Sequence, residues 1–402
     1  MSAFNEDDEE IAVPDDIQCA DQLFDVAFHP KGDYLASGLI DGVVEVWKYG
    51  VEGNKKMLGV KSHDASCRGL EFSADGNMLY TISADCCFRG LDGTGKQVFK
   101  FKAHTNPINK LSALSEHVFA TGDDVGEVKI WDTRKHGQDP VMEWHVHEDF
   151  VAGFAYSADK NTLLSVSGDA TLAAYDIKKG PGKDGTQGVQ KSDDQEAEMH
   201  CVTIFKHGKK VVCGTQDGVM LVFTWGMWGD CSDRYPGHPE TVDCILKIDE
   251  STVLTGSSDG LIRAVTVQPN KMIGVLGDHD DFPVEGMRAS PDGAYLASFA
   301  HDNIIRFNDI SMFIGDVDET EEMEEEPTPS SAPTDKGAKT ALAKAKAAGG
   351  DEDSSDDEDD GAGEEMDESS EFDSGSDDDA PAAGAGSNYK IKTAAQKFYS
   401  DL

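Results

Sequence analysis

Short stretches of alternating apolar and polar residues recur along the first three quarters of the chain, separated by turn-forming residues. Each stretch reads as an apolar residue, a turn rich in Pro, Asp and Gly, an alternating strand, an Asp-containing turn and a second alternating strand. Clear copies occupy 28–47, 72–91, 156–175 and 289–308, and weaker copies occupy 114–132, 205–223 and 247–265. Alternation with period two predicts half-buried β-strands, and its recurrence predicts seven similar units.

An aspartate marks the second turn of most copies, at steps of 40 to 48 residues. This column contains Asp41, Asp85, Asp169, Asp217, Asp259 and Asp302, whereas the third copy has Val125 there and Asp124 one place earlier. Three of these turns read Asp-Gly, a dipeptide that joins antiparallel strands tightly. Short strands at this period, about four to a repeat, predict an all-β fold, a seven-bladed β-propeller.

Two further columns accompany the aspartates. A hydroxyl residue stands four places before the turn in six copies (Ser37, Thr81, Thr121, Ser165, Thr255, Ser298), and Cys213 stands there in the fifth copy. A histidine stands about twenty-two places before the turn in five copies (His63, His104, His147, His238, His279), and tryptophan follows the turn at Trp47 and Trp131. A buried imidazole or carboxylate needs a partner, so these columns predict structural hydrogen bonds within the blades.

The His, Ser/Thr, Asp and Trp columns resemble the WD-repeat propeller family, in which these four side chains form a hydrogen-bonded string inside each blade. No copy here has the full set in register, since the third has His104, Thr121 and Trp131 but a displaced aspartate. We therefore expect the ring to be stabilised mainly by apolar packing between blades.

The predicted ring has to be closed, because an open propeller leaves a strand edge unpaired. The last clear strand, 304–310, is the third of its blade. The fourth is expected from 10–19, ahead of the first copy, with 311–317 as the alternative. The predicted organisation is an acidic disordered N-terminus (1–9), the propeller (10–315), a disordered acidic tail (316–387) and a short docking segment (388–402).

The chain is strongly acidic, with a formal net charge of −42 from 77 acidic and 35 basic residues. Residues 316–386 hold 26 acidic residues and four lysines, and residues 1–315 still carry a net charge of −22. Nucleic-acid binding needs clustered Lys and Arg, so direct binding of RNA or DNA by this body is not expected. Basic proteins are the expected partners.

The eight cysteines are scattered without a CxxC pair, which predicts neither a disulfide framework nor a zinc site. The N-terminus is acidic without an apolar signal region, and no run of eighteen apolar residues occurs. An intracellular reducing compartment and no membrane contact are therefore expected.

Candidate chemistry is weak along the whole chain. Ser, His and Asp recur together in several copies, as a structural string would, so no catalytic residue is predicted. The segments 145–149 and 277–281 place His beside carboxylates and are interpreted as loop charges. The segment 180–185 lacks the ending of a phosphate-binding loop. Neither a metal nor a cofactor is expected.

Two segments of the propeller stand apart from the repeat. Trp225 and Trp228 lie in the Gly-rich segment 225–231, where they either pack a loop against a blade or form an exposed interaction hot spot. The insertion 178–198 is polar and Gly-rich, and we expect a mobile loop there.

The acidic tail has too little apolar surface to fold on its own. Ser354, Ser355, Ser370 and Ser376 each have an acidic residue three places on and resemble acidophilic casein-kinase sites. The chain then ends in "KFYSDL", which places Phe398, Tyr399 and Leu402 at the end of a long tether. We interpret these three as a segment that becomes ordered on binding a partner.

The domain order, "TGDDVGEVKIWD" (121–132) and "KFYSDL" (397–402) resemble the WD repeat-containing protein 55 family, with its fungal Jip-five type. This resemblance implies a nucleolar, non-enzymatic factor in ribosomal RNA processing and large-subunit assembly, a monomer within a larger complex. In that family the terminal motif usually lies near a strongly basic stretch, whereas here only a few lysines remain. The residues alone predict a platform for basic proteins. A histone-binding chromatin propeller and a substrate adaptor of a ubiquitin ligase stay open as alternatives.

Overall fold

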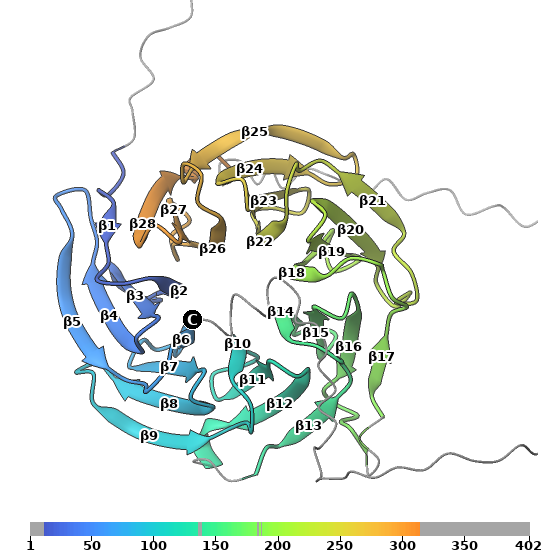
Figure 1. The fold of residues 1–402 in the computed structure, drawn as a ribbon, viewed down its shortest axis with the longest axis horizontal. Coiled ribbons are helices and arrows are strands. Elements are labelled where there is room, and N and C mark those ends of the chain that lie inside the picture. Colours follow the sequence, from blue (N-terminus) through green and yellow to red (C-terminus); the bar gives the residue numbers. More distant parts are fainter. Residues whose placement is uncertain (1–11, 136–138, 183–184, 186, 314–402) are drawn as a thin grey trace, which may run out of the picture. The chain divides into compact units, whose positions relative to one another are not determined.

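The fold is a ring of seven four-stranded antiparallel sheets (Figure 1). The computed structural model describes residues 12–135, 139–182, 185 and 187–313. The seven-bladed propeller predicted from the repeats is confirmed. Predicted features outside the described residues are the N-terminus 1–9, the tail 316–387, the segment 388–402 with Phe398, Tyr399 and Leu402, and the serines Ser354, Ser355, Ser370 and Ser376.

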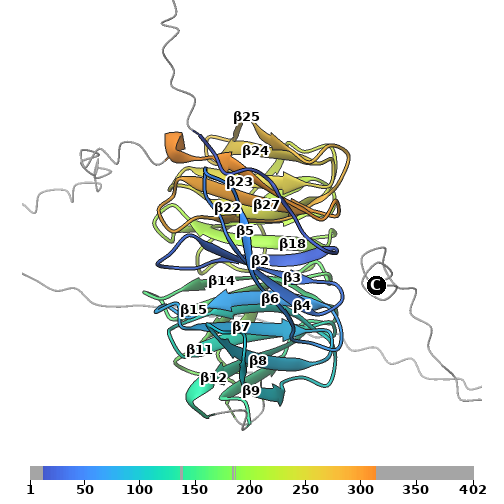
Figure 2. The ribbon, with the colours of Figure 1, turned by 90° about the vertical axis from the view of Figure 1, so that its left-hand side faces the viewer.

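Each of the first six blades is built from four consecutive strands that run outward from the centre of the ring. Blade one contains β2 (Leu23–Phe28), β3 (Tyr34–Leu39), β4 (Val43–Lys48) and β5 (Lys55–Lys61). Blade two contains β6 (Cys67–Phe72), β7 (Met78–Ser83), β8 (Cys87–Asp92) and β9 (Gln97–Lys102), which lie side by side in Figure 2. Blade three contains β10 (Ile108–Ala113), β11 (Val118–Asp123), β12 (Glu127–Asp132) and β13 (Met142–His145), with the short 3-10 helix η1 (Thr133–Lys135) after β12.

The next three blades repeat this order. Blade four contains β14 (Val151–Ser157), β15 (Thr162–Ser167), β16 (Leu172–Asp176) and β17 (Val189–Lys191). Blade five contains β18 (Met199–Phe205), β19 (Lys210–Thr215), β20 (Val219–Thr224) and β21 (Asp233–Pro236). Blade six contains β22 (Val242–Lys247), β23 (Thr252–Ser257), β24 (Leu261–Thr266) and β25 (Lys271–Asp278). The first strand of each blade therefore lines the centre of the ring (Figure 1).

Blade seven is assembled from both ends of the propeller. It contains β26 (Val284–Ala289), β27 (Tyr295–Ala300), β28 (Ile304–Asp309) and, as its outer strand, β1 (Ile17–Gln18). Ile17 pairs with Ile305 and Gln18 with Ile304. The closing strand thus comes from the segment 10–19, whereas Ser311–Phe313 of the alternative segment forms the 3-10 helix η2.

The insertion 178–198 is not a mobile loop throughout, so that expectation is wrong for its second half. Val189–Lys191 forms β17, which pairs with Ala173, Ala174 and Tyr175 of β16. The polar composition of the segment concealed this strand because β17 is the outer strand of its blade and leaves Gln190 and Lys191 exposed.

Apolar side chains fill the spaces between neighbouring blades. Between blades two and three, Tyr80 and Phe88 meet Phe119 and Trp131 in one buried cluster. The rings of Tyr80 and Phe119 lie 4.4 Å apart. Burial of one such side chain contributes about 1.5–3 kcal/mol, so these clusters are a major source of the ring's stability.

Close approach between blades also depends on glycine at the end of the second strand. A β-carbon on Gly122 would lie 2.6 Å from the β-carbon of Val151, on the next blade. A β-carbon on Gly256 would lie 2.7 Å from Val284 in the same way. A larger residue at either place would push the inner strand of the following blade away.

Ring closure can be tested at β1 by comparing its buried and its exposed residue. Ile17 is 2% exposed and belongs to the apolar cluster of blades seven and one, so Ile17→Ala should lower the free energy of unfolding by about 2–5 kcal/mol. Gln18 is exposed, so Gln18→Ala should change it by about 0.5 kcal/mol or less. Urea unfolding of the two variants measures the difference. Equal stabilities would show that β1 does not hold the ring closed.

Candidate functional site

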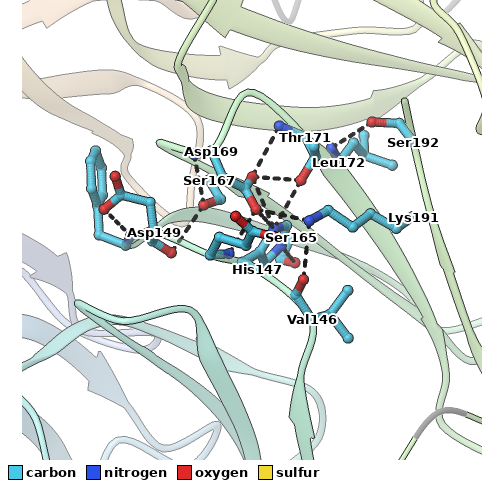
Figure 3. A network of polar contacts seen from close by, with 12 residues as sticks. Val146, His147, Asp149, Ser165, Ser167, Asp169, Thr171, Leu172, Lys191 and Ser192 are labelled. Atoms are coloured by element: carbon cyan, nitrogen blue, oxygen red, sulfur yellow. Dashed lines mark hydrogen bonds and ion pairs between the residues drawn. The ribbon is translucent and has the colours of Figure 1, made fainter. Parts of the chain in front are cut away.

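Blade four contains a continuous string of buried polar side chains (Figure 3). His147 Nε2 lies 2.6 Å from Ser165 Oγ, and its Nδ1 lies 3.3 Å from the carboxylate of Asp169. Ser165 in turn donates a hydrogen bond of 3.1 Å to the hydroxyl of Tyr175. Burial would raise the pKa of Asp169, but hydrogen bonds from His147, Thr171 and a backbone amide hold it well below its usual range.

Blades two and seven contain the same string with an added arginine. His63 Nε2 lies 2.8 Å from Thr81 Oγ1, and His63 Nδ1 lies 3.1 Å from Asp85. Arg89, four residues after Asp85, donates to that carboxylate at 2.7 Å. The equivalent set in blade seven is His279, Ser298, Asp302 and Arg306, with distances of 2.8, 3.4 and 3.2 Å. The arginine at this fixed spacing was visible in the sequence but was not recognised as part of the string.

Blade three contains the string with a tryptophan. His104 Nε2 lies 2.7 Å from Thr121 Oγ1, and Trp131 Nε1 donates to the same oxygen at 2.8 Å. His104 Nδ1 lies 3.2 Å from both Asp123 and Glu127. Burial lowers the pKa of His104, but these two carboxylates outweigh burial and raise it.

The expectation that blade three lacks an aligned carboxylate is therefore wrong. Asp123, two places before the expected column at Val125, supplies it from the end of β11. Asp124, one place before the column, instead accepts from Arg68 of blade two at 2.9 Å. The turn between β11 and β12 has three residues, as in blade two, but the carboxylate here comes from the last residue of β11 and not from the turn. Counting along the sequence therefore selected the wrong residue.

Blade six breaks the string at its histidine. His238 Nε2 lies 2.8 Å from Thr255 Oγ1, but Asp259 is paired with Arg263 at 2.9 Å. His238 Nδ1 is buried without a hydrogen-bond partner in the described part of the chain. Burial and the nearby guanidinium of Arg263 lower the pKa of His238 to about 4.

Blade one has a cysteine where other blades have the histidine. Cys19 directly follows β1 and lies 22 places before Asp41, and its Sγ lies 3.8 Å from Ser37 Oγ. Asp41 is exposed, and Trp47 Nε1 is buried without a partner among the described residues. Sequence reasoning missed Cys19, although its spacing from Asp41 matched that of the histidines.

Blade five does not form the string. Cys213 is fully buried at the hydroxyl position, while Asp217 is exposed in the turn between β19 and β20. Its core is instead apolar, with Phe205, Val212 and Val222 packed against blade six.

Trp225 and Trp228 pack against each other after β20, with ring centroids 5.1 Å apart. Trp228 is 6% exposed, and Lys160 of blade four lies 3.8 Å from the centre of the Trp225 ring. This geometry fits the packing interpretation for Trp228. Met227 between them is 70% exposed.

Two hollows of the described propeller could accept a ligand, besides a third of about 320 Å³ that Trp225 and Trp228 line. One, of about 490 Å³, lies between blades one and two and is lined largely by apolar residues that include Tyr34, Met57, Leu58 and Phe72. The other, of about 320 Å³, is enclosed by the inner strands at the centre of the ring. Four carboxylates and two cationic side chains line it (Asp25, Glu71, Asp243, Glu285, Lys110, Arg288).

Among the residues that the structure describes, one group of side chains has metal-ligating atoms within 4.8 Å of one another: His104, Asp123 and Glu127. The Lys129 ammonium lies 3.0 Å from Glu127 and already supplies a cation there. The group therefore works as a hydrogen-bonded string.

Residues 256–260 match the GxSxG pattern of hydrolases, but they form a hairpin turn, and Ser258 donates to Asp243 at 2.7 Å. A strand-to-helix turn, which that chemistry uses, is not formed there.

The ring of seven sheets and its His–Ser/Thr–Asp strings define a WD-repeat β-propeller, a class of protein-interaction scaffold. The family model WDR55 matches residues 14–313. The chain belongs to the WDR55 family.

Named relatives cover the same region of the chain. WD repeat-containing protein 55 of Bos taurus is 39% identical over 302 residues, which are 74% of this chain and 77% of the relative. The protein of that name from Arabidopsis thaliana is 38% identical over 296 residues, 72% of this chain and 81% of the relative. WD repeat-containing protein JIP5 of Coprinopsis cinerea is 36% identical over 320 residues, 76% and 77% of the two chains.

Two aspartates of the same column allow the string to be tested. Asp169→Asn removes a buried charge that accepts several hydrogen bonds and should cost about 1.5–3 kcal/mol at pH 7. Asp217→Asn, at an exposed turn, should cost about 0.5 kcal/mol or less. Chemical unfolding from pH 7 to 3 measures both.

The pH dependence of this difference has a definite sign. Because the pKa of folded Asp169 is depressed, its contribution is present above the unfolded value of about 3.9 and is lost as pH falls below it. The gap between the two variants should therefore narrow in acid. A gap that is absent at pH 7, or that grows in acid, contradicts the role of Asp169.

The histidines of blades three and six should titrate on opposite sides of the ordinary value of about 6.5. His104 should titrate above it and His238 near 4. The unfolded imidazole binds a proton near pH 6.5, whereas folded His238 binds one only near pH 4. Protonation between these two values favours the unfolded state, so the free energy of unfolding decreases as pH falls from about 6.5. NMR titration of the imidazole signals, assigned with His104→Gln and His238→Gln, measures both pKa values. If both imidazoles titrated on the same side of pH 6.5, the hydrogen-bond partners described for the two histidines would be wrong.

Proposed function

We propose that this protein is a non-enzymatic scaffold in ribosome biogenesis, acting in ribosomal RNA processing and large-subunit assembly in the nucleolus. Membership of the WDR55 family across the whole propeller carries this proposal. The resemblance of the domain order and of the ending "KFYSDL" to that family supplies the cellular process. The propeller provides the rigid body on which partner proteins assemble.

The charge of the chain supports basic proteins as the partners. Residues 1–315 carry a net charge of −22, and the centre of the ring is lined by more carboxylates than cations. Ribosomal proteins and assembly factors that carry clustered Lys and Arg are attracted by such a surface. The acidic tail adds further negative charge, and phosphorylation of its serines would increase it.

The proposal also assigns a role to the end of the chain. Phe398, Tyr399 and Leu402 offer an apolar segment, and Lys390, Lys392 and Lys397 make its surroundings basic after a long acidic run. A short segment of this kind gains its order from a partner rather than from its own chain. We therefore assign it as a docking segment. Within the described residues, no helix is long and apolar enough to cross a membrane.

Sedimentation of cell extract on a sucrose gradient tests this function. Full-length protein should run with the precursors of the large ribosomal subunit. A variant without residues 388–402 should remain at the top of the gradient. A variant with residues 388–402 in scrambled order controls for length and charge and should also remain at the top.

The remaining outcomes of the gradient experiment contradict different parts of the proposal. If all variants sediment with the precursors, the propeller carries the contact and the docking role of the last residues is wrong. If full-length protein never enters these fractions, ribosome biogenesis is contradicted. Binding to histones H3–H4 under those conditions would then favour the chromatin alternative.

A further inference from the structure

Three neighbouring blades place carboxylates at one end of the central cavity. Asp243 and Glu285 are the second residues of β22 and β26, and both line the cavity with His200, the second residue of β18. These inner strands lie next to one another around the centre of the ring (Figure 1). The two carboxylates therefore face the same enclosed space from adjacent blades.

Each carboxylate uses one oxygen within the protein and keeps the other for a ligand. Ser258 donates to Asp243 Oδ2 at 2.7 Å, and His301 Nε2 lies 3.1 Å from Glu285 Oε1. Asp243 Oδ1 and Glu285 Oε2 have no hydrogen-bond or ion-pair partner among the described residues. Both residues are half-buried, so these oxygens are reached from the cavity. The site thus presents two acceptors on neighbouring strands.

Among the described residues, the side chains that line this end of the cavity supply no permanent cation. His200 Nε2 is buried without a partner in the described part of the chain, and burial lowers the pKa of this imidazole to about 4, so it is neutral at pH 7. Glu198, directly before β18, also has a buried oxygen without a partner there. Burial first, and the charge of Glu285 second, raise the pKa of Asp243 to about 8, so this carboxyl is largely protonated at pH 7 in the free protein. A cation that enters favours the ionised form of Asp243 and is then held by both carboxylates.

The cationic side chains of the cavity are elsewhere or already engaged. Arg288 lies 3.4 Å from Asp25 and donates to a backbone carbonyl of blade one. Lys110, on β10 of blade three, lines the cavity from a non-adjacent blade. Asp243 and Glu285 thus lie on neighbouring blades away from both cations, whereas Glu71 of blade two is near Arg288.

We infer that this end of the cavity binds an arginine side chain of a partner protein, with Asp243 Oδ1 and Glu285 Oε2 accepting hydrogen bonds from its guanidinium. Guanidinium is planar and presents N–H donors in a fixed fork, which suits two acceptors held on neighbouring strands. The three-residue metal-ligating group in the described chain lies in blade three instead, so this site suits an organic cation. The inference rests on the proposed function to the extent that it specifies one contact with a basic partner.

The central cavity is large enough for one side chain and not for a folded element. Its volume is about 320 Å³, at the lower end of the roughly 300–1,000 Å³ of small-ligand sites. An arginine at an exposed turn or at a chain terminus of the partner would enter it. The remaining surface of the ring would then contact the rest of that partner.

Binding of short peptides to purified full-length protein tests the site. The probe is acetyl-Gly-Gly-Arg-Gly-Gly-amide, compared with peptides that carry citrulline or lysine in place of arginine. The Asp243→Asn/Glu285→Gln variant removes the charges that both carboxyls carry in the complex, with little change of shape, and should weaken arginine binding at least about tenfold. The citrulline peptide should bind the unaltered protein at least about tenfold more weakly as well.

A matched variant controls for the loss of two charges. Asp217→Asn/Glu52→Gln removes two exposed carboxylates that do not line the cavity and should bind the arginine peptide as the unaltered protein does. Every variant keeps the acidic tail, so binding to the tail is a constant background. The imidazole NMR signals of His200 should shift when the arginine peptide is added to the unaltered protein. They should not shift when the same peptide is added to the Asp243→Asn/Glu285→Gln variant.

Three outcomes would overturn the inference: equal affinity in the cavity variant, equal weakening in the surface control, or unchanged His200 signals at saturation. Lysine binding as tight as arginine binding would contradict the guanidinium geometry. Thermal unfolding of Asp243→Asn and Glu285→Gln singly shows whether either variant fails to fold. Because the peptides are defined and the protein is purified, these results do not depend on the gradient experiment. If full-length protein sediments with the precursors but the cavity variant binds arginine normally, this inference is wrong and the proposed function stands.

Discussion

Ring closure is the constraint on which the rest of this structure depends. Only two residues, Ile17 and Gln18, form the strand that completes blade seven, yet they join parts of the chain almost 290 residues apart. The next residue, Cys19, enters blade one and contacts Ser37 where other blades use histidine. One short segment therefore fixes blade seven to blade one. Without it the inner strands would not be held around a common cavity.

Within the closed ring, two kinds of interaction have different tasks. Apolar clusters fill the spaces between blades, and glycines such as Gly122 allow the inner strand of the next blade to approach. The polar strings act inside single blades, where they tie the loop before the inner strand to the second strand and its turn. They vary more than the apolar packing. Blade five has no string, and in blade six the carboxylate of Asp259 is directed to Arg263.

The sequence was sufficient for the fold because period-two alternation and the seven-fold repeat are local signals. It was less informative on residues that take an unusual place in their repeat. Asp123 was missed because the carboxylate of blade three stands at the end of β11 and not in the turn, and Cys19 was missed because a thiol was not considered in the place of an imidazole. The cavity site could not be predicted from the sequence, because Asp243 and Glu285 come from different repeats and approach each other only in the closed ring. Ser258 lies within the GxSxG pattern of residues 256–260, which gives no indication of a cavity, and His301 lies in no recognisable motif.

Zero-length coupling of carboxylates to partner amines, in complexes isolated with the full-length protein, tests most directly whether the ring is an acidic scaffold for basic proteins. Mass spectrometry of the linked peptides locates the contact. Links from Glu198, Glu240 and Asp281, near the end of the cavity where the inner strands of blades five to seven begin, are the predicted result. Links confined to the outer rim, such as Glu143 of β13 and Glu52 in the turn before β5, with none around the cavity, would contradict it.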